Sequence, residues 1–183
     1  LVFGGAILFY LTERKGLFVN MSFKERVLSS LFAAVSPRTA GFNTVDTMKM
    51  SQAGKLLTVI LMYIGAGSGS TAGGIKISTM FVILSCIYTS ITRKYGLNAF
   101  GRRIDDEAIK SGMAISALNM ILIIIGTMII LTVQNMNEID VIYEVTSAMS
   151  TVGMTVGITR DMNIISRIVL ILLMYLGRVG GLT

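Results

Sequence analysis

The sequence predicts an all-α integral membrane fold with channel-like repeats of helix, short pore helix and helix, and with one interrupted membrane helix. Composition is the first reason, because 53% of the 183 residues are hydrophobic and 14% are charged, against about 45–50% and about 25% in a soluble domain. The second is an uncharged run from Ser111 to Val133, about 23 residues, which is long enough to cross the hydrocarbon core of a bilayer. The third is a set of short segments that recurs after 112 residues.

The chain opens on an apolar segment, Leu1 to Thr12, that is about half as long as a membrane span. Because it starts without methionine or the basic flank of a signal peptide, we expect an incomplete first helix and a longer parent chain. The next segment, Ser22 to Ser36, is amphipathic and about 13–15 residues long, which suits a re-entrant helix. Its Ser22-x-x-Glu25 pattern predicts a capping box at the helix N-terminus.

A glycine-containing stretch follows this short helix, and a similar one follows a second short helix predicted at Glu138 to Ser150. The two stretches are Thr39, Ala40, Gly41, Phe42, Asn43 and Thr44, and Thr151, Val152, Gly153, Met154, Thr155, Val156 and Gly157. An extended Thr-x-Gly backbone can turn successive carbonyl groups to one side, and glycine permits the positive φ angles of such a curl. A short helix with this stretch, placed between two spans, is the plan of a pore loop.

The apolar segment from Lys49 to Arg93 is broken near its middle by ten small residues. They are Gly65, Ala66, Gly67, Ser68, Gly69, Ser70, Thr71, Ala72, Gly73 and Gly74. This composition predicts a half-helix, an irregular loop and a second helix. Irregular backbone at membrane depth persists only where protein buries it or water lines it, so the break indicates a transport pathway.

Basic residues cluster in the middle of the chain and indicate that the loop there faces the cytoplasm; they are Arg93, Lys94, Arg102, Arg103 and Lys110. Arg38, Lys49 and Lys55 are interpreted as interfacial charges.

A shift of 112 residues places Thr39 on Thr151, Gly41 on Gly153, and the Met-Tyr-Ile-Gly of 62–65 on the Met-Tyr-Leu-Gly of 174–177. Residues 1–94 are therefore one pore repeat, with a truncated outer helix, a pore helix, a filter stretch and an interrupted inner helix. Residues 95–183 are a cytoplasmic linker and a second repeat. Because a carbonyl filter needs a closed ring, two such loops supply only half of it.

Several function classes are excluded by residues that are missing. The chain has no histidine and one cysteine, Cys86, which excludes zinc and haem sites and the usual catalytic triads; we expect no enzyme. Ile75 separates Gly74 from Lys76, so the glycine-rich segment fails the phosphate-binding Walker pattern. The 16 basic residues are spread between the apolar segments, as residues flanking membrane spans would be, and we expect no nucleic-acid partner.

Three segments resemble the Trk/Ktr/HKT superfamily of potassium transporters, most closely its bacterial Ktr membrane subunits. They are the run Ser-Pro-Arg-Thr-Ala-Gly-Phe-Asn-Thr-Val-Asp at 36–46, the glycine-rich run 65–76, and Gly-Arg-Val-Gly at 177–180. The resemblance implies four repeats around a central pore, of which this chain is the third and fourth. It also implies a multi-pass protein of a bacterial cell membrane that takes up potassium ions.

The resemblance further implies functional residues and partners. Gly41 and Gly153 correspond to filter glycines, with potassium held by backbone carbonyls near them, and residues 65–74 correspond to the gate below the filter. Arg178, which lies about 16 Å beyond Arg167 along the last helix, corresponds to an arginine facing that gate. The implied partners are a second copy of the chain, a cytosolic ring of nucleotide-binding RCK subunits, and the lipid bilayer. We expect potassium as the bound ion, sodium as an activator, and no organic cofactor in this chain.

Two other functions remain open from the sequence. A secondary transporter of another substrate could use the same kind of broken helix, and coupled exchange of that substrate would identify it. A membrane scaffold for a cytosolic protein is the second alternative, and ion flux through the complete protein would exclude it.

Overall fold

The structure is a computed structural model that describes residues 2–14, 16–19, 21–67, 69, 73–92, 98–99, 102–103 and 106–179. Its helices are α1 (Val2–Glu13), α2 (Phe23–Val35), α3 (Gln52–Tyr63), α4 (Ile77–Thr92), α5 (Asp106–Val133), α6 (Glu138–Met149) and α7 (Ile164–Val179), with short 3-10 helices η1 (Thr47–Lys49) and η2 (Ile158–Asp161). The predicted all-α class is confirmed. One small addition is an antiparallel pair of two-residue strands, β1 (Asn98–Ala99) and β2 (Arg102–Arg103), which the sequence does not predict.

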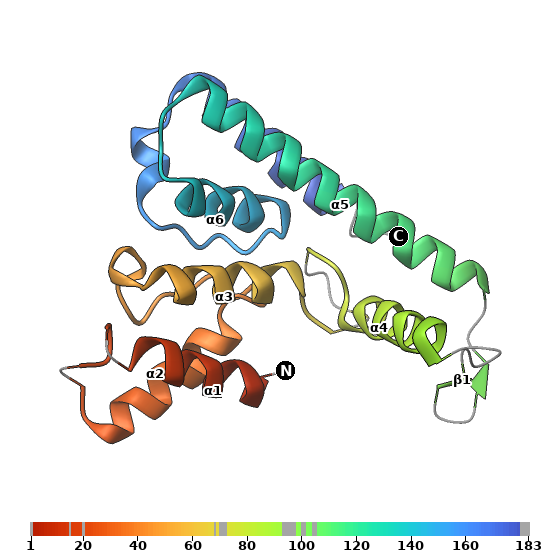
Figure 1. Cartoon of the computed structure of the whole chain (residues 1–183). Helices are drawn as coiled ribbons and strands as arrows, with labels where there is room; N and C mark the ends of the chain where they lie inside the picture. Colours follow the sequence, from red (N-terminus) through yellow and green to blue (C-terminus); the bar gives the residue numbers. More distant parts are fainter. Residues whose placement is uncertain are drawn as a thin grey trace.

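The first three helices pack around an apolar core of their own (Figure 1). Its buried members are Ala6, Phe9, Ala33, Ala34, Met50 and Leu61. A Cβ added to Gly5 would lie 3.3 Å from the Cβ of Ala34, so the absent side chain lets α1 and α2 approach closely. The capping box forms as predicted, because the Ser22 N–H donates to the Glu25 carboxylate at 2.8 Å.

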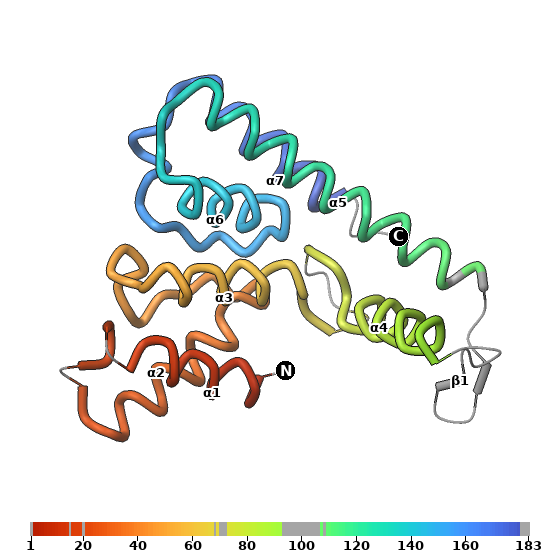
Figure 2. Tube along the Cα trace, viewed as in Figure 1, coloured from red at the N-terminus to blue at the C-terminus, as the bar shows by residue number. Residues whose placement is uncertain are grey.

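The last three helices form a second group, in which α7 returns alongside α5 (Figure 2). Their core comprises Ile130, Val141, Val145, Ala148, Met149, Met162, Leu170 and Leu173. A Cβ on Gly126 of α5 would lie only 2.7 Å from Cδ1 of Leu173, so this glycine makes room for α7.

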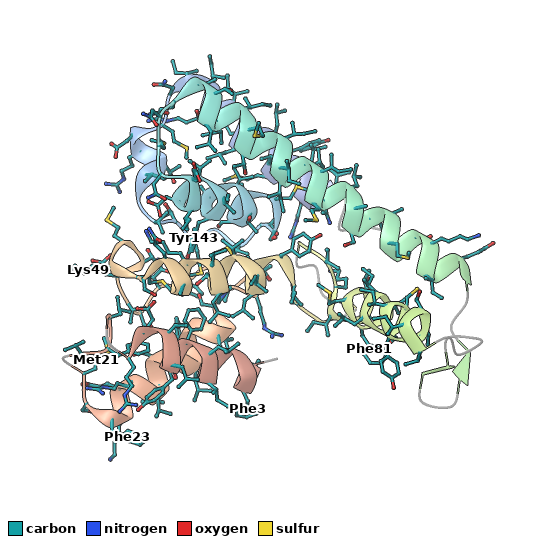
Figure 3. All side chains as sticks on the ribbon, in the orientation of Figure 1. Phe3, Met21, Phe23, Lys49, Phe81 and Tyr143 are labelled. Atoms are coloured by element: carbon teal, nitrogen blue, oxygen red, sulfur yellow. The ribbon has the colours of Figure 1, made fainter. Side chains whose placement is uncertain are left out.

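Helices α3 and α6 lie against each other and join the two groups. Figure 3 shows Tyr143 of α6 in this junction, and its side chain is 0% exposed. It packs with Met62 of α3 and with Val152, Met154 and Val156. The chain after α6 therefore begins inside the junction between the two groups.

The long uncharged run forms a continuous helix. Within the described residues, Ile109–Val133 is the one helix segment long and apolar enough to cross a membrane, with 25 residues and a mean hydropathy of 2.5. It begins two positions before the predicted Ser111 and ends at the predicted Val133. Two shorter apolar helices, α1 and α4, are about a half to two thirds of this length.

The order of elements recurs along the chain. A pore-loop unit of helix, extended stretch, 3-10 helix and second helix appears twice. It is formed by α2, 36–46, η1 and α3, and again by α6, 150–157, η2 and α7. Helices α3 and α7 begin at Gln52 and Ile164, which are 112 residues apart. The boundary predicted at residues 94 and 95 lies outside the described residues and stays a prediction.

Candidate functional site

The two predicted filter stretches, 39–43 and 151–154, have the same unusual backbone. Thr39 and Thr151 have φ of 66° and 53°, and Gly41 and Gly153 have φ of 75° and 82°. The threonines are the non-glycine residues with positive φ in the described part of the chain, and such residues are uncommon in proteins. Two positive φ angles separated by one residue produce the same sharp curl in both stretches.

A serine at the end of each pore helix holds the curl in place. The Ser147 hydroxyl donates to the carbonyl oxygen of Met154 at 2.6 Å, and the Ser36 hydroxyl donates to the carbonyl oxygen of Phe42. In each stretch the acceptor is the residue directly after the filter glycine. The role of these serines was not predicted, although a serine lies three positions before Thr39 and four positions before Thr151.

The two filter stretches touch each other at Gly41. A Cβ on this residue would lie 2.4 Å from the carbonyl oxygen of Val152, a contact that no side chain tolerates. A Cβ on Gly153 would meet no atom within 4 Å. Space therefore requires glycine at position 41, where φ also favours it, whereas at position 153 only φ favours glycine within this chain.

The predicted interruption of the apolar segment from Lys49 to Arg93 is present. Helix α3 ends at Tyr63 and α4 begins at Ile77, and between them Ile64 and Ile75 pair as an isolated parallel bridge. The Gly65 N–H donates to the carbonyl of Ile75 at 2.9 Å, which closes the loop at its base. Ser68 and residues 70–72 of the predicted gate lie outside the described residues.

The returning arm of this loop, at Gly73 and Gly74, lies against the start of the second filter stretch. The Gly73 N–H donates to the Thr151 hydroxyl at 3.2 Å. A Cβ on Gly73 would lie 2.5 Å from that hydroxyl oxygen and 2.6 Å from the Ser150 carbonyl oxygen. The loop and the second filter stretch are thus in direct contact, because Gly73 has no side chain to separate its backbone from Ser150 and Thr151.

Arg178 lies in the last turn of α7, beside a close helix contact. A Cβ on the neighbouring Gly177 would lie 1.9 Å from the carbonyl oxygen of Met149, the last residue of α6. This contact places the C-terminal turn of α7 at the end of the pore helix, where the second filter stretch starts. The predicted contact between Arg178 and the gate stays a prediction.

Three further charged side chains belong to this region: Lys55, which the sequence led us to interpret as an interfacial charge, and Asp140 and Glu144, to which it assigned no role. Lys55 of α3 and Asp140 of α6 form an ion pair of 2.6 Å with side chains 13% and 18% exposed, so Lys55 has a specific partner across the junction. Glu144 lies in the middle of α6 and is 5% exposed. Glu144 is the acidic residue of α6 nearest to the second filter stretch, and this position is a signal that sequence reading could have used.

The family model described as TrkH, cation transport protein, matches residues 2–183. The chain belongs to this family. Among curated TrkH-family relatives, the potassium/sodium uptake protein NtpJ of Enterococcus hirae is 42% identical over 188 residues, covering 100% of this chain and 42% of that protein. The Ktr system potassium uptake protein B of Bacillus subtilis is 33% identical, covering 92% of this chain and 38% of that protein.

The fold also matches a solved TrkH-family structure. The crystal structure of the potassium transporter TrkH from Vibrio parahaemolyticus superposes with a TM-score of 0.84 at 19% identity, over 98% of this chain and 40% of that one. The chain spans about two fifths of the length of the curated relatives that it matches. The predicted family and membrane fold are confirmed, and the chain corresponds to one part of such a transporter.

Proposed function

We propose that this chain forms part of the potassium uptake pathway of a multi-pass transporter in a bacterial cell membrane. The observation that carries the proposal is the pair of matching filter stretches, each with positive φ at Thr and Gly and in contact at Gly41. The printed names of the relatives, which describe potassium or potassium/sodium uptake, support the choice of ion.

The filter would work by replacing water around the ion. A potassium ion entering a narrow pore exchanges its hydration shell for carbonyl oxygens, and the curled backbone near Gly41 and Gly153 supplies them. Helices α2 and α6 end immediately before these stretches. Their C-terminal partial negative charges therefore favour a cation there.

The loop at 65–74 would act as the gate, and Arg178 would hold it and add an electrostatic barrier to cations. The contact between Gly73 and Thr151 supports this assignment, because a movement of the returning arm would break or shift a hydrogen bond to the second filter stretch. An arginine at membrane depth needs acceptors, and irregular backbone supplies free carbonyl groups.

Other parts of the complete transporter would supply the rest of the machinery. Two further filter stretches would close the ring, a second copy of the transporter would form a homodimer, and a cytosolic RCK ring would regulate it. Potassium is the transported ion and sodium an activator, with no organic cofactor in this chain. The Ktr names of several relatives support a membrane subunit with regulatory partners.

Ion uptake by the complete transporter in sealed vesicles tests the proposal. We expect uptake selective for potassium over sodium, and reduced discrimination in Gly41→Ser and Gly153→Ser. Uptake without potassium preference, or variants with unaltered selectivity, would contradict the filter assignment. Obligatory exchange of another substrate would favour a secondary transporter, and absence of flux would favour a scaffold.

A further inference from the structure

Glu144 is a buried carboxylate that the proposed pathway leaves without a role. It is 5% exposed and lies on α6, nine positions before the filter glycine Gly153. In the first repeat the position 112 residues earlier is Phe32. A carboxylate at this position therefore belongs to the second repeat alone, and the first repeat forms its pore helix and filter stretch without one.

The carboxylate makes three hydrogen bonds, all to the segment that follows the second filter stretch. One oxygen, Oε1, accepts the Val156 N–H at 3.0 Å and the Thr155 hydroxyl. The other oxygen, Oε2, accepts the Thr159 hydroxyl at 3.0 Å. Three hydrogen bonds to one buried carboxyl group fix the position of residues 155–159 relative to α6.

The fixed segment is also one of the places where the two repeats meet. The Thr155 hydroxyl accepts the Gly157 N–H at 2.8 Å, and the Thr155 carbonyl accepts the Thr47 hydroxyl of the first repeat at 2.7 Å. Met48 of that repeat lies against Gly157, since a Cβ there would be 1.9 Å from the methyl carbon of Met48. The bonds of Glu144 thus set the position at which the first repeat contacts the second filter.

A cavity of about 370 Å³ lies beside this segment and explains why the filter needs support there. Its lining includes Glu144, Gly153, Met154 and Thr155. Backbone that borders a cavity has no packed neighbour on that side to hold it. The Glu144 carboxylate anchors this segment from α6, together with the Ser147 hydroxyl that donates to the Met154 carbonyl.

We propose that Glu144 is a positioning residue for ion selectivity, which holds the carbonyl groups after Gly153 in register through Thr155, Val156 and Thr159. This inference rests on the proposed potassium uptake. Glu144 acts through the segment that it binds, because its three hydrogen bonds all go to that segment. A weaker acceptor would let the segment relax into the cavity and would reduce the discrimination between potassium and sodium.

The test compares potassium and sodium uptake by the complete transporter in vesicles. Glu144→Gln keeps the size and weakens the acceptor, and we expect the potassium-to-sodium uptake ratio to fall about ten-fold. Glu144→Asp keeps the charge and should retain more of the ratio than Gln does. Thr159→Val removes one donor and should lower the ratio about three-fold. Glu138→Gln, an exposed change on the first turn of the same helix, is the control and should leave the ratio unchanged.

Each result is read against the amount of folded protein and its unfolding temperature in detergent. A ratio unchanged in folded Glu144→Gln overturns the inference, and so does an equal loss of both ions with the ratio intact, which marks a purely structural role. If Glu144→Gln does not fold, Thr159→Val decides, and an unchanged ratio there overturns the inference. Absence of selective potassium uptake in the unsubstituted transporter overturns the proposed function as well, which separates the two failures.

Discussion

Replacing each filter glycine by alanine separates two reasons for glycine at these positions, a positive φ angle and a lack of space for a side chain. Gly41 and Gly153 share a positive φ, which costs a non-glycine residue about 1–2 kcal/mol. Only Gly41 also lacks space, because its Cβ would lie 2.4 Å from the Val152 carbonyl oxygen, 0.6 Å short of the 3.0 Å limit for such contacts. Overpacking of this kind adds about 1–3 kcal/mol, so we expect about 2–5 kcal/mol for Gly41→Ala and about 1–2 kcal/mol for Gly153→Ala.

A side chain at position 41 would push on the second filter stretch as well as on its own. Val152 belongs to the other filter stretch, so a side chain at position 41 displaces a carbonyl of the second repeat while it changes the first. The assays are thermal unfolding of the purified complete transporter and its potassium-to-sodium uptake ratio. We expect the larger loss in both for Gly41→Ala. A loss for Gly153→Ala as large as that for Gly41→Ala would refute the argument from space.

Three further predictions follow from contacts around the gate and the junction. Thr151→Val removes the oxygen that accepts the Gly73 N–H, and potassium flux should rise about three-fold or more as the loop loosens. Arg178→Gln removes the predicted barrier and should also raise potassium flux through the transporter. Lys55→Met leaves the partly buried Asp140 without its partner and should lower the free energy of unfolding by about 1–3 kcal/mol, whereas the double variant with Asp140→Leu should recover part of the loss.

Each of these has a matched control or a contrary outcome. Thr151→Ser keeps the hydroxyl and should give the potassium flux of the unsubstituted protein. A flux in Thr151→Ser as high as that in Thr151→Val would contradict the role of the Gly73–Thr151 hydrogen bond. Unchanged or lower flux in folded Arg178→Gln would argue against a gating role. Lys49→Met breaks the exposed pair with Asp46, whose side chains are 78% and 47% exposed, and should cost about 0–1 kcal/mol. A loss as large as that for Lys55→Met would contradict the role of burial.

Local chemistry explains why several elements were predictable. The capping box of Ser22 and Glu25 lies within one helical turn, so its donor and acceptor are set by spacing alone. The uncharged run that ends at Val133 forms a helix because its backbone hydrogen bonds are satisfied within the segment. The interruption after Tyr63 was also predictable from local sequence, since ten small residues, five of them glycine, have low helix propensity and little side chain to pack.

The contacts that organise the candidate site join residues far apart in the chain. Gly73 and Thr151 are 78 positions apart, Lys55 and Asp140 are 85, and Thr47 and Thr155 are 108. No spacing rule relates such pairs, and the roles of Gly41 and Gly153 differ only because Val152 lies beside one of them. Likewise, Glu144 was visible as an acidic residue close before the second filter stretch, but its three hydrogen bonds depend on the position of residues 155–159 in the fold.

By itself the sequence determined the membrane composition, the short capped helices, the interrupted helix and the 112-residue spacing of the two Thr-x-Gly stretches, because each depends on residues that are close together or on direct self-comparison. The tertiary structure alone decided that the two stretches meet at Gly41, that the returning arm of the loop lies on Thr151, and that a buried carboxylate supports the second stretch. Those contacts arise when α3 packs on α6, and the packing of two helices depends on the shapes of both surfaces together.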